Sequence, residues 1–290
     1  MTMNGNKDAA RSPKVSIQGY EGCFHQLAAC HFFGPGVEVL PCATFGDVVR
    51  SVETGEADAG VMAIENSIAG SIMPNYRLLQ KGSLTIVGEV LLHIRQHLMA
   101  LPGVGMESVE EVRSHPMALL QCMDFLERED HRRFRLVETE DTALSARRLV
   151  ETGRRDAAAI AGSLAAELFG LEIIAPDIHT VKNNYTRFLI LRRAGEAGKV
   201  EGADKASLYF SVPHEHGSLV SVLRCFDGRG INMTKLQSYP IPSDPFRYLF
   251  HVDVEFDSVS GFEEAMEAVR GVTERLCVCG IYKKGLFVNE

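Results

Sequence analysis

Two polar runs at the ends of apolar segments have the residue types of a binding or catalytic site. Residues 183–187 (NNYTR) stand directly before the apolar run 188–191, and residues 65–67 (ENS) follow the apolar run 60–64. Their amides and hydroxyls can donate and accept hydrogen bonds, and a guanidinium can neutralise a carboxylate. A strand needs none of these side chains for its own backbone pairing, so the runs indicate a site for a polar small molecule.

Three turns could contribute to the same site. Gly70-Ser71 follows the ENS run, residues 19–25 (GYEGCFH) follow a predicted strand at 15–18, and Ser114-His115-Pro116 precedes a predicted helix. Glycine lets a ligand approach the backbone, and the start of a helix offers free N–H groups to an anion. Each turn is also consistent with ordinary α/β chain reversal or with a helix N-terminal cap.

An internal repeat organises the first two-thirds of the chain. The segment TFGDVVRSVETGEADAGVMAI from Thr44 resembles TALSARRLVETGRRDAAAIAG from Thr142. In the first copy Thr44 and Asp47 fit a capping box, and the apolar spacing predicts a helix that ends before Gly55. Each copy is therefore predicted as a helix, a turn and a buried parallel strand. Two such α/β lobes leave a cleft between them, where ligands gather at the carboxyl ends of strands.

The final third of the chain has a different pattern. Residues 194–205 are polar and glycine-rich, which predicts a linker. Beyond it, strands and amphipathic helices follow one another in the order βαββαβ, as in an α+β ferredoxin-like module. The predicted domains are residues 14–193 and residues 206–286.

Composition excludes several classes of protein. With 290 residues and 46% hydrophobic content the chain can bury a proper core, and its net charge of −8 argues against general affinity for nucleic acid. The polar start and the lack of an apolar run of about 18 residues predict a cytoplasmic protein without a membrane partner. Seven scattered cysteines indicate reduced thiols rather than disulfides or a metal site.

Four motifs in order carry a specific resemblance. GYEGCFHQLAA, GVMAIENSIAGS, SHPMALLQC and NYTRFLIL, followed by the βαββαβ module, resemble prephenate dehydratase over about residues 15–282. The C-terminal part resembles an ACT regulatory domain, with residues 216–220 (HGSLV) and 236–240 (LQSYP) at the effector motifs of the family. Gln237 and Tyr239 replace the Glu and Arg of the usual effector motif.

The resemblance implies a fold and a reaction. The expected catalytic domain is two-lobed and periplasmic-binding-protein-like. It converts prephenate to phenylpyruvate, water and carbon dioxide in L-phenylalanine biosynthesis. Aromatisation of the ring drives this elimination, so no metal or other cofactor is expected. L-phenylalanine is the expected allosteric effector, and a homodimer or homotetramer is the expected assembly.

The same resemblance assigns the site residues. Thr186 is the expected catalytic residue, which donates a hydrogen bond to the leaving hydroxyl. The expected substrate contacts are Asn66, Ser67, Ser71, Ser114, Gln121 and Arg187. The expected supporting network is Glu65, His115 and Glu140. The expected effector contacts are Gly217, Ser218, Leu219, Val220, Gln237 and Ser238. Strand alternation directs Arg187 away from the face of Thr186, so the alternative for Arg187 is an ion pair that holds its strand.

Two other functions stay open at this point. Arogenate dehydratase performs the same elimination on a substrate with an amine in place of the keto group, and the sequence does not settle this selectivity. A non-catalytic small-molecule sensor or transport-type binding protein also suits two α/β lobes around a cleft.

Overall fold

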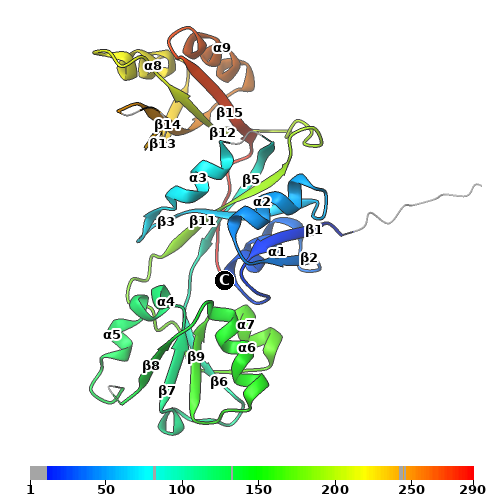
Figure 1. The fold of residues 1–290 in the computed structure, drawn as a ribbon, viewed down its shortest axis with the longest axis vertical. Helices are drawn as coiled ribbons and strands as arrows, with labels where there is room; N and C mark the ends of the chain where they lie inside the picture. Colours follow the sequence, from blue (N-terminus) through cyan, green and yellow to red (C-terminus); the bar gives the residue numbers. More distant parts are fainter. Residues whose placement is uncertain (1–11, 81–82, 132, 242–243, 245) are drawn as a thin grey trace, which may run out of the picture.

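The computed structural model describes residues 12–290, except residues 81–82, 132, 242–243 and 245. Three units are stacked along the long axis of the molecule (Figure 1): a C-terminal unit, a first α/β lobe and a second α/β lobe. The C-terminus returns to the level of the junction between the two lobes (Figure 1). None of the described helices is both long and apolar enough to cross a membrane.

The first lobe is built on a seven-stranded sheet with the order β16-β5-β11-β3-β1-β2, in which β4 also pairs with β3. Its strands are β1 (Lys14–Gln18), β2 (Glu38–Cys42), β3 (Ala59–Asn66), β4 (Gly70–Ser71), β5 (Leu84–His93), β11 (Tyr185–Arg193) and β16 (Phe287–Val288). Its helices are α1 (Phe24–Phe33), α2 (Phe45–Glu53) and α3 (Met73–Leu79). The central strand β11 pairs antiparallel with both β3 and β5, so residues 185–187 of the polar run lie inside the sheet.

The second lobe contains a five-stranded sheet with the order β10-β6-β9-β7-β8. Its strands are β6 (His97–Ala100), β7 (Glu111–Ser114), β8 (Arg135–Glu138), β9 (Ala157–Ala161) and β10 (Glu172–Ala175). Its helices are α4 (Pro116–Gln121), α5 (Met123–Leu126), α6 (Thr142–Thr152) and α7 (Ser163–Phe169), with a 3₁₀ turn at Met106–Ser108. The chain crosses between the lobes twice, from β5 to β6 and from β10 to β11 (Figure 1).

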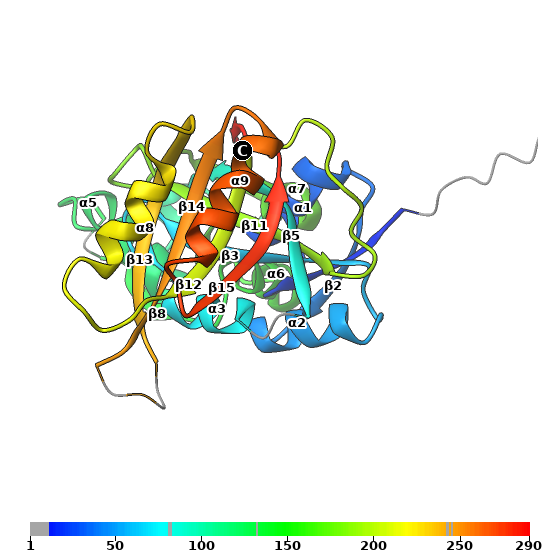
Figure 2. The same cartoon turned by 90° about the horizontal axis from the view of Figure 1, so that it is seen from above.

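The C-terminal unit follows the βαββαβ order expected from the sequence. Its elements are β12 (Lys205–Ser211), α8 (Ser218–Phe226), β13 (Ile231–Pro240), β14 (Tyr248–Phe256), α9 (Val259–Arg270) and β15 (Arg275–Tyr282). The strands form an antiparallel sheet with the order β13-β14-β12-β15. Both helices cover one face of this sheet, and the other face is turned toward the first lobe (Figures 1 and 2).

The repeated helix-turn-strand units are confirmed as α2-β3 and α6-β9. Thr44 and Asp47 form the expected capping box, in which each side chain accepts from the other residue's backbone N–H. The strands β3 and β9 are buried but only partly parallel, because β11 is antiparallel to β3 and β6 is antiparallel to β9. The seven cysteines carry free thiols, as expected.

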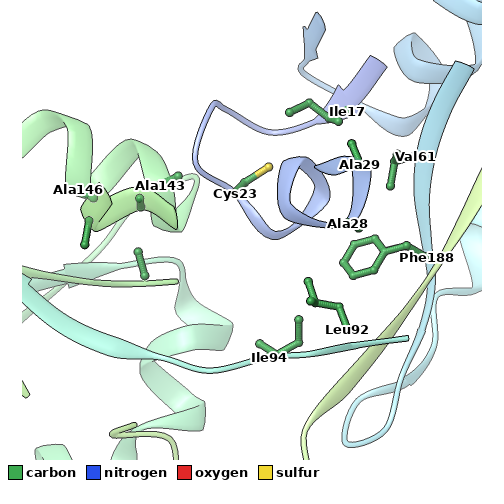
Figure 3. Close-up of a cluster of buried hydrophobic side chains, with 14 of the residues drawn as sticks. Ile17, Cys23, Ala28, Ala29, Val61, Leu92, Ile94, Ala143, Ala146 and Phe188 are labelled. Atoms are coloured by element: carbon green, nitrogen blue, oxygen red, sulfur yellow. The ribbon is translucent and has the colours of Figure 1, made fainter. Parts of the chain in front are cut away.

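One hydrophobic core continues across the junction between the lobes. Ala143 and Ala146 of α6 belong to the same buried cluster as Ala28, Phe188 and Leu92 of the first lobe (Figure 3). The loop before α1 reaches this junction, where Gly22 has a φ of +86° and a side chain added to it would lie 3.1 Å from the Ala165 Cα. Glycine at this turn therefore serves lobe packing rather than ligand approach.

Candidate active site

A cavity of about 330 Å³ lies in the cleft between the two lobes. Its wall residues with polar side chains are Gln18, His25, Asn66, Gln96, His115, Gln121, Glu140, Asp141, Thr142 and Thr186. Phe45, Ile72 and Phe188 add apolar surface to the wall. Of the two polar runs found in the sequence, each contributes one residue, Asn66 and Thr186.

Asn66 and Thr186 form a hydrogen-bonded pair whose direction is fixed. The Asn66 Oδ1 accepts from the backbone N–H groups of Ile68 and Ala69, at 3.0 and 2.9 Å. The Asn66 Nδ2 therefore faces β11, where it donates to the Thr186 Oγ1 at 3.0 Å and to the Asn184 Oδ1 at 2.7 Å. Since the Thr186 oxygen accepts, and no described residue accepts from it, its own proton is available to a ligand in the cleft.

The second lobe and the crossing segment supply the opposite wall. His115 caps α4 through its Nδ1, which accepts from the Met117 N–H at 3.2 Å, so neutral His115 carries its proton on Nε2. Gln96 donates through Nε2 to the Gln121 Oε1 at 3.4 Å, which leaves the Gln121 amide N–H groups for the cleft. His25 is partly buried in the wall, and this burial lowers its pKa to about 3, so it is neutral near pH 7.

Asp141 is a wall residue that the sequence analysis missed. It is the N-cap of α6, and its Oδ1 accepts from the Leu144 N–H at 2.9 Å. Burial raises the pKa of Asp141 despite this hydrogen bond. The only sequence signal at this position is an Asp directly before a predicted helix, which is typical of a cap. The neighbouring Glu140, which was expected in the network, has an exposed side chain that accepts from Arg148 at 2.9 Å.

Comparison with known proteins identifies the family of the chain. Residues 15–196 match the family model described as prephenate dehydratase. The chain belongs to the prephenate dehydratase family. A bifunctional chorismate mutase/prephenate dehydratase from Aquifex aeolicus (strain VF5) is 35% identical over 274 residues, which cover 94% of this chain and 74% of that protein. Arogenate dehydratase/prephenate dehydratase 2, chloroplastic, from Arabidopsis thaliana is 38% identical over 272 residues, which cover 90% of this chain and 69% of that protein.

Solved structures share the fold across nearly the whole chain. The prephenate dehydratase of Arthrobacter aurescens in complex with L-Phe has a TM-score of 0.82 and 28% identity, covering 93% of this chain and 89% of that one. GqqA, described as a novel type of quorum quenching acylase, has a TM-score of 0.83 and 30% identity, and the match covers 94% of this chain and 98% of that one. Because the prephenate dehydratase family consists of hydro-lyases, the chain is an enzyme, and a non-catalytic sensor is not supported.

The structure brings together only some of the residues expected at a prephenate dehydratase site. Thr186, Asn66, Gln121, His115 and Glu140 line the cleft cavity. The three expected serines do not line it. Ser114 is buried and donates to the Ile160 carbonyl at 2.6 Å, which ties β7 to β9. Ser67 donates to the Asn183 carbonyl at 3.2 Å, and Ser71 accepts from Lys235 at 3.0 Å. Their hydroxyls bond backbone or lysine groups that are remote in the sequence, which spacing alone did not reveal.

Arg187 and Glu65 lie on the other face of the sheet from the cleft. The Arg187 Nε bonds Glu89 at 2.6 Å, one terminal nitrogen bonds Asp253, and the other donates to the Tyr282 hydroxyl at 3.0 Å. Of the two alternatives for Arg187, the structure shows the ion pair and not a cleft contact. Glu65 likewise pairs with Lys235 of β13, at 2.7 Å. Strand alternation is the physical reason, since neighbours of Thr186 and Asn66 must point away from the face that those two residues occupy.

Proposed function

We propose that the chain catalyses the decarboxylative dehydration of prephenate to phenylpyruvate. In this reaction the ring carboxylate leaves as carbon dioxide, and the electron pair of the broken C–C bond enters the ring. The ring hydroxyl leaves with one proton as water, and the ring becomes aromatic. The observation that carries the proposal is the Thr186 hydroxyl, held in the cleft by Asn66 with its proton free.

Thr186 is proposed to donate a hydrogen bond to the departing hydroxyl. Such a bond strengthens as charge develops on the leaving oxygen, and a preorganised donor of this kind contributes roughly 3–4 kcal/mol. A threonine hydroxyl is too weak an acid to supply the proton alone. Asp141 in the same cavity wall is the proposed proton source, since burial raises the pKa of its carboxyl group, and the His115 Nε2–H is a further hydrogen-bond donor.

The amides of the cleft are proposed to bind the two carboxylates. Gln96 and Gln121 lie in the wall, and no arginine or lysine is among the described wall residues. The Asn66 Nδ2 is already engaged by Thr186 and Asn184, so Asn66 orients the Thr186 hydroxyl and does not bind a carboxylate. Hydrogen bonds from amide N–H groups therefore orient the dianion, and the apolar surface of Phe45 and Phe188 accommodates the ring.

The test is to incubate the purified chain with prephenate, and separately with arogenate, in the presence of a metal chelator. We expect phenylpyruvate from prephenate, at a rate that exhaustive chelation does not change. Formation of phenylalanine from arogenate, with prephenate left intact, would support the arogenate dehydratase alternative instead. Conversion of neither substrate, or strict dependence on a metal, would contradict the proposal.

The C-terminal unit is proposed to be an ACT domain with a ferredoxin-like fold. We assign residues 14–193 to the catalytic domain, residues 194–205 to the linker and residues 206–286 to the ACT domain. The βαββαβ order and the strand order β13-β14-β12-β15 support this assignment. The match to the L-Phe complex from Arthrobacter aurescens covers 93% of the chain, so it extends into this unit.

L-phenylalanine is proposed as the effector of this domain. Ser218 and Leu219 line a cavity of about 180 Å³ together with Arg247 and Tyr248, and Gly217 precedes α8 with a φ of +83°. Gln237 and Ser238 do not line this cavity but lie on β13, an edge strand of the sheet. An edge strand can pair with a second chain, so we propose a homodimer or homotetramer in which β13 approaches the partner's effector site.

A further inference from the structure

The strands β3 and β11 present different residues on their two faces. On the cleft face lie Thr186 and Phe188 of β11 with Asn66 and Ala63 of β3. On the face toward the C-terminal unit lie Arg187 of β11 and Glu65 of β3. The register pairs Thr186 with Asn66 and Arg187 with Glu65. Each reacting residue of the proposed site is thus the direct chain neighbour of a charged residue on the opposite face.

A bulge in β3 adds to the effect of strand alternation. The register shifts between Arg187 and Phe188, so that Arg187 pairs with Glu65 but Phe188 pairs with Ala63, and Ile64 is the extra residue of β3. Bulges of this kind re-aim side chains and are enriched next to active sites. Because Ile64 takes up the extra position, both Ala63 and Asn66 reach the cleft face. Glu65 stands between this bulge and Asn66, whose amide is oriented by the Ile68 and Ala69 N–H groups.

The C-terminal unit holds both charged neighbours. Arg187 of the first lobe pairs with Asp253, Glu65 pairs with Lys235, and Glu89 of β5 pairs with Lys205 at 2.8 Å. Across the neighbouring strands β5, β11 and β3 of the first lobe, Glu89, Arg187 and Glu65 alternate in sign. Each of them pairs with an opposite charge on the C-terminal unit. Arg187, Glu89, Asp253 and Lys205 are each less than one-tenth exposed, so water does not screen the Arg187–Asp253 and Glu89–Lys205 pairs, whereas the Glu65 side chain of the third pair is 37% exposed.

We propose that Arg187 and Glu65 are positioning residues for Thr186 and Asn66. Through Asp253 and Lys235, the C-terminal unit holds the two strands in the geometry in which the Asn66 amide meets the Thr186 hydroxyl. This inference rests on the proposed function, since it assigns these four residues a role in the same reaction. Its consequence is that the C-terminal unit contributes to catalysis in the absence of any effector.

The test uses the full chain and two substitutions on the C-terminal unit, Lys235→Met and Asp253→Asn. Each removes one charge and nearly preserves side-chain size, and neither residue lines the cleft. If the pairs position Thr186, each variant lowers kcat for prephenate by about tenfold or more and changes KM by less than about threefold. The matched control is Arg270→Met, which removes a cation from the exposed Arg270–Glu267 pair of α9 and leaves kcat unchanged.

Two further measurements separate positioning from simple stabilisation. The double exchange Glu65→Lys with Lys235→Glu restores the pair with reversed charges and is expected to recover kcat above that of either single variant. The NMR signal of the Thr186 methyl group, assigned by its loss in Thr186→Ser, is expected to shift in Lys235→Met but not in Arg270→Met. This signal tests the positioning even if the wild-type chain converts neither prephenate nor arogenate, an outcome that contradicts only the proposed function.

Unchanged kcat together with an unchanged Thr186 methyl signal in folded Lys235→Met would overturn the proposal. A fall in melting temperature with normal turnover would show that the ion pairs are structural only, which also overturns it. Asp253 is deeply buried, so Asp253→Asn could fail to fold; Lys235 lies at the edge of the cluster, and its variant then decides the outcome.

Discussion

The Asn66 side-chain amide donates a hydrogen bond to the Thr186 hydroxyl oxygen at 3.0 Å, across the ladder between β3 and β11. The direction of this bond matters more than its length. It occupies a lone pair of the threonine oxygen and leaves the threonine proton as the only donor that the pair can offer to a substrate.

Replacement of Thr186 by valine should abolish that donor while preserving shape. We expect Thr186→Val to lower kcat by tenfold or more, where each factor of ten corresponds to about 1.4 kcal/mol of transition-state stabilisation. Thr186→Ser keeps the hydroxyl and should retain most of the activity. Steady-state kinetics with prephenate measure both variants. A folded Thr186→Val enzyme with near-normal kcat would remove Thr186 from the mechanism.

Asn66→Asp should be more damaging than Asn66→Ala. A carboxylate at this position accepts the Thr186 proton and so turns the hydroxyl away from the substrate, and it also places a negative charge beside a dianion. Alanine only removes the partner. We therefore expect kcat/KM to fall in both variants and to fall further in Asn66→Asp, as measured at the same pH. The reverse order would show that Asn66 does not set the direction of the hydroxyl.

Asp141→Asn should stabilise the protein at neutral pH. Burial raises the pKa of Asp141 in the folded state above its unfolded value of about 3.9. The stability that this group contributes is thus fully present below the unfolded pKa and is lost as the pH rises through the folded pKa. Asparagine stays neutral and can still cap α6. Thermal unfolding should therefore give a higher Tm for the variant near pH 7 and no difference below about pH 4.

The neighbouring residue provides a control of opposite sign. The hydrogen bond from Arg148 holds the pKa of Glu140 below its usual value, so the ionised form of Glu140 favours folding at neutral pH. Glu140→Gln should consequently leave Tm equal or lower near pH 7. A Tm gain from Glu140→Gln as large as that from Asp141→Asn would show that the effect is general loss of negative charge.

Gly217→Val should blunt inhibition by L-phenylalanine. Gly217 has a φ of +83°, which a β-branched residue adopts only with strain, and it immediately precedes two residues of the proposed effector cavity. Gly228 is a matched control, since its φ is +71° and open space surrounds it at the far end of α8. Inhibition curves should shift to higher phenylalanine for Gly217→Val and not for Gly228→Val. Equal shifts in both would indicate a general distortion of the unit.

Local patterns in the sequence determined the elements and the family of this protein. Residues a few positions apart encode the capping box at Thr44, the repeated helix-turn-strand unit and the βαββαβ order. Hydrophobic periodicity and turn residues predict such elements from the local sequence alone. The same local runs contain Asn66 and Thr186, so the sequence could point to the two strands of the proposed site. It could also predict, by alternation, that Arg187 leaves the face of Thr186.

Only the tertiary structure decided which polar groups reach the cleft and which serve other contacts. Ser114 was expected to contact substrate but bonds a carbonyl 46 residues away, whereas Asp141, which the sequence analysis did not single out, lines the cavity. The partners of Arg187 are equally remote, since Glu89 and Asp253 come from different units of the chain. A side chain's role depends on what the fold places against it, and such long-range pairings leave no period or spacing in the sequence from which they could be deduced.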